Sequence, residues 1–423
     1  MAKINSVKAR QIIDCKCRPM VEVDIITTDG ALGRGSAPTG SSVGTHEAFV
    51  LRDGNPNEYS GMSVHHAVDN VNNTIAPLLI GLDVDDQRNI DMQMTALDGT
   101  PNKQILGGNA IYSVSVACLR AAAESHGVPT YEYLCGRKIH TVPVPSFNVI
   151  NGGHYGEIVQ PFNEFLIVPY GADNICEAIE IAVKCFAELE NVLSKYTSSS
   201  PRVARSYGWA PPSDDPKTIL ELISRAVEQL GYANKVAYAL DCASSEMYDA
   251  QSNTYLLNKS RVGADALIEY SRKLSEAFPM VFMEDLLDEN DWTHYPLATR
   301  SIPRSIMIGD DLIATDLARI RRAYETRAVD GFVLKPNQVG TVTEALDTHN
   351  FAKQHGMFSV PSGRAGGVVG DVVMDFALGL EVGFIKNGAP RSGERIDKLN
   401  FLMRACDLTS GCTMADITPQ LRF

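Results

Sequence analysis

The sequence contains no apolar stretch long enough to span a bilayer, and its first residues, MAKINSVKAR, lack the apolar core of a signal peptide. It also has no basic run, and its formal net charge is −13. These absences argue against a membrane protein and against nucleic acid as a partner. We therefore expect a cytoplasmic protein that has neither a membrane nor a nucleic acid as its partner.

Cysteine patterns typical of a disulfide framework or a zinc site are missing as well. The nine cysteines are scattered, and no histidine follows the close pair Cys15 and Cys17 at zinc-site spacing. We expect reduced thiols, as in cytosolic proteins. The chain also lacks a Walker motif, a dinucleotide fingerprint and an internal repeat of solenoid type.

The 423 residues are 44% hydrophobic and 21% charged, which is typical of a globular protein, and the length suggests two domains. Residues 1–135 predict an α+β domain, with an antiparallel meander followed by helices at 64–79 and 109–126. The stretch 36–44, SAPTGSSVG, is too rich in Gly, Ser and Pro for regular structure. We place a second domain at residues 140–423.

In this second domain, short apolar segments recur at the spacing of one strand-plus-helix unit, and each segment ends in a polar residue. The clearest is GFVLKPNQVG, in which Phe332–Leu334 have the length of a strand buried on both faces. The polar residues that close the segments are Asp241, Glu284, Asp310, Lys335, Arg364 and Lys386. This order predicts an α/β barrel of parallel strands that carries its chemistry at one rim.

Three of these residues are carboxylates: Asp241, Glu284 and Asp310. On neighbouring strand ends they would repel one another unless a hard divalent cation with oxygen ligands, such as Mg²⁺, lay between them. Each residue alone is explained as well by a helix N-cap or a solvated loop position, because aspartate is common after strands. Three at consecutive strand ends favour a metal site.

The cationic residues at the strand ends suggest a base and an anion-binding group beside the metal site. Lys335 and Lys386 each close an apolar strand, and beside a bound cation and a second ammonium the pKa of a lysine falls, so its neutral amine can act as a base. Arg364 lies in SGRAGGVVG, where glycines let the backbone approach a ligand such as phosphate. Taken singly, each could also be an ordinary surface residue or part of a turn.

Nine segments in this order make the chain similar to the enolase family, the phosphopyruvate hydratases of glycolysis, over nearly its entire length. They are ARQIIDCKCRPMVEVD, HEAFVLRDG, FNVINGG, NEFLIVPYGA, ALDCASSEMYD, MEDLLDENDW, IGDDLIATD, LKPNQVGT and IKNGAPRSGER. The resemblance implies an enolase-type (β/α)8 barrel with an N-terminal α+β capping domain. It also implies a homodimer and a carbon–oxygen lyase that uses Mg²⁺ and a small phosphorylated carboxylate substrate.

The resemblance further implies a role for each matching residue. Asp241, Glu284 and Asp310 would bind the first Mg²⁺, and Ser42 would bind the second together with the substrate phosphate. Lys335 would remove the proton alpha to the carboxylate, and Lys386 would hold that carboxylate. Arg364 would hold the phosphate, Ser362 would also contact the substrate, and Glu164 would be a catalytic residue on the acid side of the pocket.

This sequence departs from the family pattern on the acid side. Where enolases read GDEGGFAP the chain reads ARSYGWAP, so Ser206 replaces a glutamate that helps to expel hydroxide. The family's SHRSG becomes SGRAG, which replaces a histidine by Gly363 and a phosphate-binding serine by Ala365. The remaining differences fall at Asn163, which replaces a glutamine, and at His154 and Tyr155, where the family histidine is displaced by one position. We expect Asn163, His154, Tyr155 and Ser206 to contact the substrate.

Three functions remain open from the sequence. The first is dehydration of 2-phosphoglycerate to phosphoenolpyruvate. The second is enolate chemistry on another phospho- or phosphono-carboxylate, as in carboxyphosphonoenolpyruvate synthase. The third is a non-catalytic binding protein that keeps the fold. The retained acidic and lysine residues count against the third function, and the altered acid side counts against the first.

Overall fold

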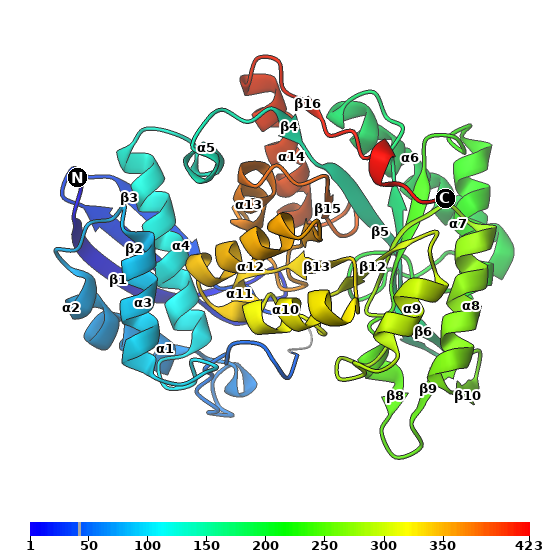
Figure 1. Ribbon diagram of the computed structural model, residues 1–423, viewed down its shortest axis with the longest axis horizontal. Helices are drawn as coiled ribbons and strands as arrows, with labels where there is room; N and C mark the ends of the chain where they lie inside the picture. The colour runs from blue at the N-terminus through cyan, green and yellow to red at the C-terminus, as the bar shows by residue number, and fades with distance from the viewer. Residues whose placement is uncertain (41–43) are drawn as a thin grey trace.

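A three-stranded antiparallel sheet with helices packed on it forms the N-terminal part of the molecule (Figure 1). The computed structural model describes residues 1–40 and 44–423. A Cβ on Gly33 or Gly35 would lie 2.0 or 2.1 Å from a backbone oxygen of the helix that packs on the sheet, so only glycine allows this approach. The elements are β1 (Ile4–Ile13), β2 (Pro19–Thr27), β3 (Leu32–Ser36), α1 (His65–Asn70), α2 (Ala76–Leu79), α3 (Gln87–Asp98), the packing helix α4 (Gly108–Ser125) and α5 (Thr130–Cys135). The helix expected at 64–79 contains a π-helical turn at Val71–Ile75.

An eight-stranded barrel follows, and the barrel expected from the sequence is confirmed. Its strand order is β14-β13-β12-β11-β7-β6-β5-β15, and a bridge between Ser362 and Lys386 brings the two edge strands together. The strands are β5 (Val144–Tyr155), β6 (Ile158–Val168), β7 (Ala237–Asp241), β11 (Met280–Glu284), β12 (Ile306–Gly309), β13 (Gly331–Leu334), β14 (Phe358–Pro361) and β15 (Phe384–Lys386). Their inward apolar side chains form a buried core below the polar rim.

One strand breaks the expected all-parallel arrangement. Strand β6 runs antiparallel to both β5 and β7, whereas the other strand pairs of the barrel are parallel. Only Gly156 and Glu157 separate β5 from β6, and a parallel pair needs a much longer crossover connection. The prediction of parallel strands was therefore wrong for β6.

Helices surround the barrel on its outside (Figure 1). They are α6 (Ile175–Thr197), α7 (Pro216–Gln229), α8 (Ala264–Ala277), α9 (Tyr295–Ser301), α10 (Leu317–Thr326), α11 (Pro336–Val339), α12 (Val342–Gln354), α13 (Val373–Gly379) and α14 (Gly393–Leu408). Short strands lie outside the barrel at β4 (Thr141–Val142), β8 (Tyr248–Asp249), β9 (Thr254–Leu257), β10 (Ser260–Val262) and β16 (Thr413–Met414). Within the described ranges, no helix combines the length and apolarity that crossing a membrane requires.

The N-terminal part reaches the barrel rim through its loops. Thr39 bridges to Gly366, and the backbone N–H of Cys15 donates to the carbonyl of Gly367 at 3.1 Å. The loop after β14 is thereby fixed from both sides, which places residues of the N-terminal part next to the barrel's polar rim.

Candidate active site

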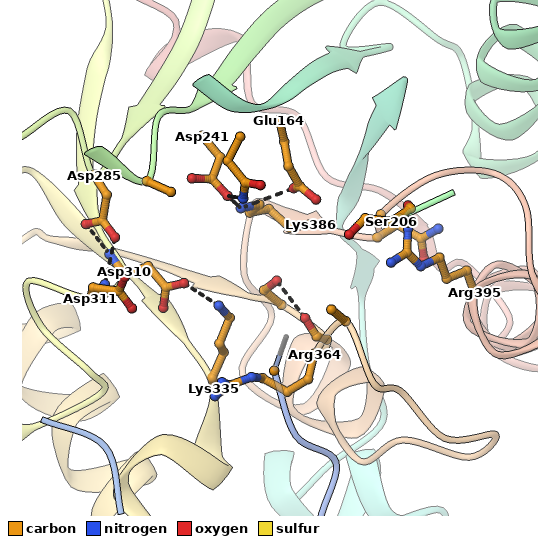
Figure 2. A pocket seen from close by; sticks show the side chains of 18 of the residues that line it. Glu164, Ser206, Asp241, Asp285, Asp310, Asp311, Lys335, Arg364, Lys386 and Arg395 are labelled. Atoms are coloured by element: carbon orange, nitrogen blue, oxygen red, sulfur yellow. Dashed lines mark hydrogen bonds and ion pairs between the residues drawn. The ribbon is translucent and has the colours of Figure 1, made fainter. Parts of the chain in front are cut away.

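A cavity of about 150 Å³ opens at the rim where the parallel strands end. Figure 2 shows Asp285, Asp310 and Asp311 at one end and Ser206 and Arg395 at the other. Glu164, Asp241 and Lys386 lie along one side, and Lys335 and Arg364 lie opposite them. The structure thus gathers most of the residues expected from the sequence around one space.

The Lys386 ammonium is surrounded by carboxylates. It donates to Asp241 at 3.2 Å and to Glu284, and it lies 3.6 Å from Glu164. Burial alone would lower the pKa of Lys386, but Asp241 and Glu284 raise it well above the ordinary lysine value. Lys386 is therefore a permanent positive charge, suited to hold an anionic group.

Lys335 and Asp310 form a second pair across the cavity. The Lys335 ammonium donates to one Asp310 oxygen, and Gln338 donates to the other at 2.8 Å. Burial would lower the pKa of Lys335 and Asp310 raises it, with a net upward shift. Lys335 therefore stays protonated while Asp310 is its partner.

The donor set fits a hard cation such as Mg²⁺. Among the described residues, Glu284 Oε1 is buried and has no hydrogen-bond partner. Burial, and then the neighbouring Asp241, raise the pKa of Glu284 well above the ordinary value. An orphaned carboxylate oxygen beside further carboxylates is what a divalent cation with oxygen ligands would satisfy.

The carboxylates that lie closest together are not the three expected from the sequence, however. In the part of the barrel rim that the structure describes, the three groups whose ligand atoms all lie within 4.8 Å of one another are Asp285, Asp310 and Asp311. The expected trio of Asp241, Glu284 and Asp310 does not meet this spacing, since Lys386 pairs with the first two and Lys335 with the third. Asp310 belongs to both sets.

Asp285 holds the backbone of the next strand end in place. Its carboxylate accepts the backbone N–H groups of Asp310 at 2.9 Å and Asp311 at 2.7 Å. Its own backbone lies in the left-handed region at φ 44°. Burial and the charge of Asp310 raise the pKa of Asp311 to about 7. Asp285 thus positions Asp310, which faces Lys335.

Arg364 lies in the cavity wall on the side of Lys335, and its expected role in phosphate binding stays a prediction. Its guanidinium donates to both oxygens of Glu47 at 2.7 and 3.1 Å. Ser362 lines the cavity too, but its hydroxyl donates to the carbonyl of Gly363 at 3.2 Å. Ser42 lies outside the described residues, so its expected role in a second metal site stays a prediction.

Asn163 and Ser206 reach the cavity, while His154 and Tyr155 do not. Asn163 donates to Asp241 at 3.0 Å, and the carbonyl of Ser206 accepts from Arg395 at 2.6 Å. His154 and Tyr155 line two separate hollows beside the cavity. The expected substrate contacts of His154 and Tyr155 therefore stay a prediction.

Several lining residues were missed by reasoning from the sequence. Asp285 and Asp311 directly follow expected ligands, and that adjacency was an available signal. Arg395 and Lys398 on α14 also line the cavity. Arg395 is the last residue of the segment IKNGAPRSGER, which was an available signal. A single lysine on a helix, such as Lys398, is indistinguishable in sequence from part of a solvated face.

A barrel whose rim pairs buried lysines with carboxylates defines an acid–base enzyme of the (β/α)8 class. Two family models match the chain: "Enolase, N-terminal domain" at residues 4–134 and "Enolase, C-terminal TIM barrel domain" at residues 139–415. Relatives named enolase from Methanococcus aeolicus and Thermococcus gammatolerans are 40% and 41% identical over 95% of this chain and 94% of their own length. One from Methanopyrus kandleri is 41% identical over 96% and 95%. The chain belongs to the enolase family and is an enolase-type lyase.

Proposed function

We propose that this chain is a Mg²⁺-dependent lyase that removes the proton alpha to the carboxylate of a small phosphorylated acid and then expels a β-substituent. The reaction is of the type that converts 2-phosphoglycerate to phosphoenolpyruvate. The observation that carries the proposal is that Lys335 and Lys386 enter one cavity from opposite sides, each against carboxylates. A lysine base and an ene-diolate stabilised by Mg²⁺ are already established for the enolase superfamily.

In this proposal each side chain of the cavity has a defined role toward the substrate or the metal ion. Lys335 takes the proton from the alpha carbon once Asp310 no longer pairs with it, and Lys386 holds the substrate carboxylate. Arg364 holds the phosphate. Asp241, Glu284 and Asp310 would hold Mg²⁺, which when bound offsets the negative charge that develops on the carboxylate.

An enolase paralogue that acts on another phospho- or phosphono-carboxylate is the second candidate. It is favoured by the acid side of the cavity, where Ser206 presents a carbonyl to Arg395 and where Gly363 and Ala365 replace the family's histidine and serine. A non-catalytic binding protein is disfavoured, since buried charged groups are costly to keep without a use.

Proton exchange tests the proposal directly. With Mg²⁺ and 2-phosphoglycerate in heavy water, the protein should exchange the C2 proton, as followed by NMR. The absence of exchange from this substrate and from phospholactate would contradict the proposed chemistry. We also propose a homodimer in the cytoplasm, as the family implies, and light scattering of the purified protein tests the dimer.

A further inference from the structure

Lys398 on helix α14 is a buried cation that faces the cavity. Its side chain is 4% exposed, yet it is among the residues that line the cavity. Among the described residues its ammonium has no hydrogen-bond acceptor, and its ion-pair partner, Asp371, lies 3.7 Å away. A buried ammonium with so little compensation is costly unless a ligand or water completes its hydrogen bonds.

Gly363 makes room for this ammonium. A Cβ added at Gly363 would lie 2.0 Å from Lys398 Nζ, so any side chain at this position would displace the lysine. The backbone of Gly363 lies outside the left-handed region, so its conformation does not require glycine. The Lys398 ammonium can therefore occupy the cavity only because residue 363 has no side chain.

Arg395 lies one helical turn away and extends the positive surface. Its side chain is 6% exposed, and its guanidinium holds the Ser206 carbonyl and lies 3.5 Å from Glu394. Asp371 and Glu394 are the acidic partners of Lys398 and Arg395, so the net charge of the four side chains is zero. Neither carboxylate is among the described residues that line the cavity, whereas both cations are. At this end the cavity therefore presents positive charge.

The other cations in the wall are already paired. Lys335, Lys386 and Arg364 each donate to a carboxylate within hydrogen-bond distance. Lys398 makes no such bond within the described ranges, so it is the cation best placed to bind an incoming anion.

We propose that Lys398, with Arg395 beside it, binds a further anionic group of the substrate at the end of the cavity away from the metal-ligating carboxylates. This inference rests on the proposed function, which already places a phosphate on Arg364 and a carboxylate on Lys386. The substrate class that follows is a phosphorylated or phosphono-carboxylate that carries an additional carboxylate, phosphonate or comparable anion on its β-carbon side.

Two probes that differ by one anionic group test this subsite. Phospholactate carries a phosphate and one carboxylate, and O-phosphomalate adds a carboxylate on the β-carbon. We expect the wild-type protein with Mg²⁺ to bind O-phosphomalate at least about tenfold more tightly in calorimetry, the size of one or more hydrogen bonds to charged groups. Lys398→Met should abolish that preference and leave phospholactate affinity within about twofold, while Lys398→Arg should keep most of it.

Gly363→Ala is the second variant, because it displaces the ammonium without removing the charge from the chain. Gly363→Ala should lose the preference for O-phosphomalate, as Lys398→Met does. The control variant Lys273→Met, on the exposed face of α8, should keep that preference. Equal affinities in the wild type, including no measurable binding of either probe, would overturn the subsite. An equal loss for both probes in Lys398→Met would overturn it too. Proton exchange from 2-phosphoglycerate is measured separately: if exchange occurs, only the subsite has failed, and if it does not, the proposed function has failed.

Discussion

Glu47 of the N-terminal part and Arg364 of the barrel rim form a bidentate ion pair in which both side chains are almost fully buried, at 4% and 5% exposure. Burial lowers the pKa of Arg364, and Glu47 raises it, with a net upward shift. The pair therefore links the two parts of the molecule through a residue expected to bind the substrate phosphate.

We predict that Glu47→Ala lowers the free energy of unfolding by about 3 kcal/mol or more, because it leaves the Arg364 charge buried without its partner. Urea denaturation followed by circular dichroism measures this change. Glu58→Ala, on an exposed loop of the same part, should change it by less than about 0.5 kcal/mol. Equal effects of the two variants would contradict the importance of the buried pair.

Metal binding should depend on Asp310, which belongs both to the expected trio and to the closely spaced one. We expect calorimetry to detect Mg²⁺ binding in the wild type and none in Asp310→Ala, and we expect chelation to abolish activity. Asp249→Ala, in the short strand β8 outside the barrel, is the control and should keep Mg²⁺ binding. Glu284→Gln should also abolish binding if its orphaned oxygen is a ligand; unchanged binding there would exclude Glu284 from the metal site.

Lys335 should be needed for proton transfer more than for binding. Lys335→Ala is expected to abolish C2 exchange while it changes phosphoenolpyruvate affinity by less than about tenfold, or roughly 1.4 kcal/mol. Exchange at an undiminished rate would assign the proton transfer to another group. Lys273→Ala serves as the surface control for both measurements.

Because the acid side of the cavity is altered, we expect dehydration of 2-phosphoglycerate to be slower than exchange of its C2 proton. A positioned general acid is worth about 10²–10⁴ in rate, and Ser206 supplies none. Against a median turnover of about 10 s⁻¹, we expect dehydration at roughly 0.1 s⁻¹ or less, with C2 exchange faster. Absorbance of phosphoenolpyruvate and NMR exchange measure the two rates. Dehydration at an ordinary turnover would show that another group supplies the proton.

Three groups could replace the missing acid by residue type, namely Tyr207, Asp214 and His154, and each of them is engaged or distant. Tyr207 donates to the carbonyl of Cys15 at 3.4 Å, and burial raises its pKa. Asp214 pairs with Lys259 at 3.1 Å, and His154 lies in a neighbouring hollow. In the described part of the chain, none of the three lines the cavity. We therefore expect their substitution to leave the dehydration rate within about threefold.

Stability should fall in mild acid because of His349 on α12. Burial, with a smaller contribution from Lys353, lowers the pKa of His349 to about 4, compared with the ordinary value of 6.5. Between these values the unfolded chain binds a proton that the folded protein does not, so stability is lost as the pH falls through this window. From pH 7.5 to 5, the wild type should lose about 2 kcal/mol more than His349→Gln. Exposed His355 provides the control substitution, and parallel losses in wild type and His349→Gln would contradict the assignment.

Much of the barrel could be predicted from its strand ends. GFVLKPN predicted a buried strand that stops at Lys335, and β13 ends at Leu334 immediately before that lysine. Asp215 followed by Pro216 is a helix-start signal that can be read in the sequence, and Asp215 caps α7 in the structure. These signals are local, since apolar runs and capping residues act within a few positions.

Other features depend on contacts that no local pattern encodes. The direction of β6 depends on the two-residue connection before it and not on its own residues. The burial of Lys398 depends on the space that Gly363 leaves on another strand's loop. The grouping of Asp285 with Asp310 and Asp311 arises from hydrogen bonds that the Asp285 carboxylate accepts from the backbone N–H groups of the other two residues. Such features require the folded arrangement.

The close approach of Gly363 to Lys398 has an evolutionary consequence. A single substitution at residue 363 would remove the Lys398 ammonium from the cavity end and leave Arg395 there, because any side chain at residue 363 takes the place of the ammonium. Residue 363 does not have to contact the ligand itself, and Lys398, which makes the contact, does not have to change. Related genes could therefore acquire or lose a substrate preference in one mutational step, with the proton-transfer machinery left intact.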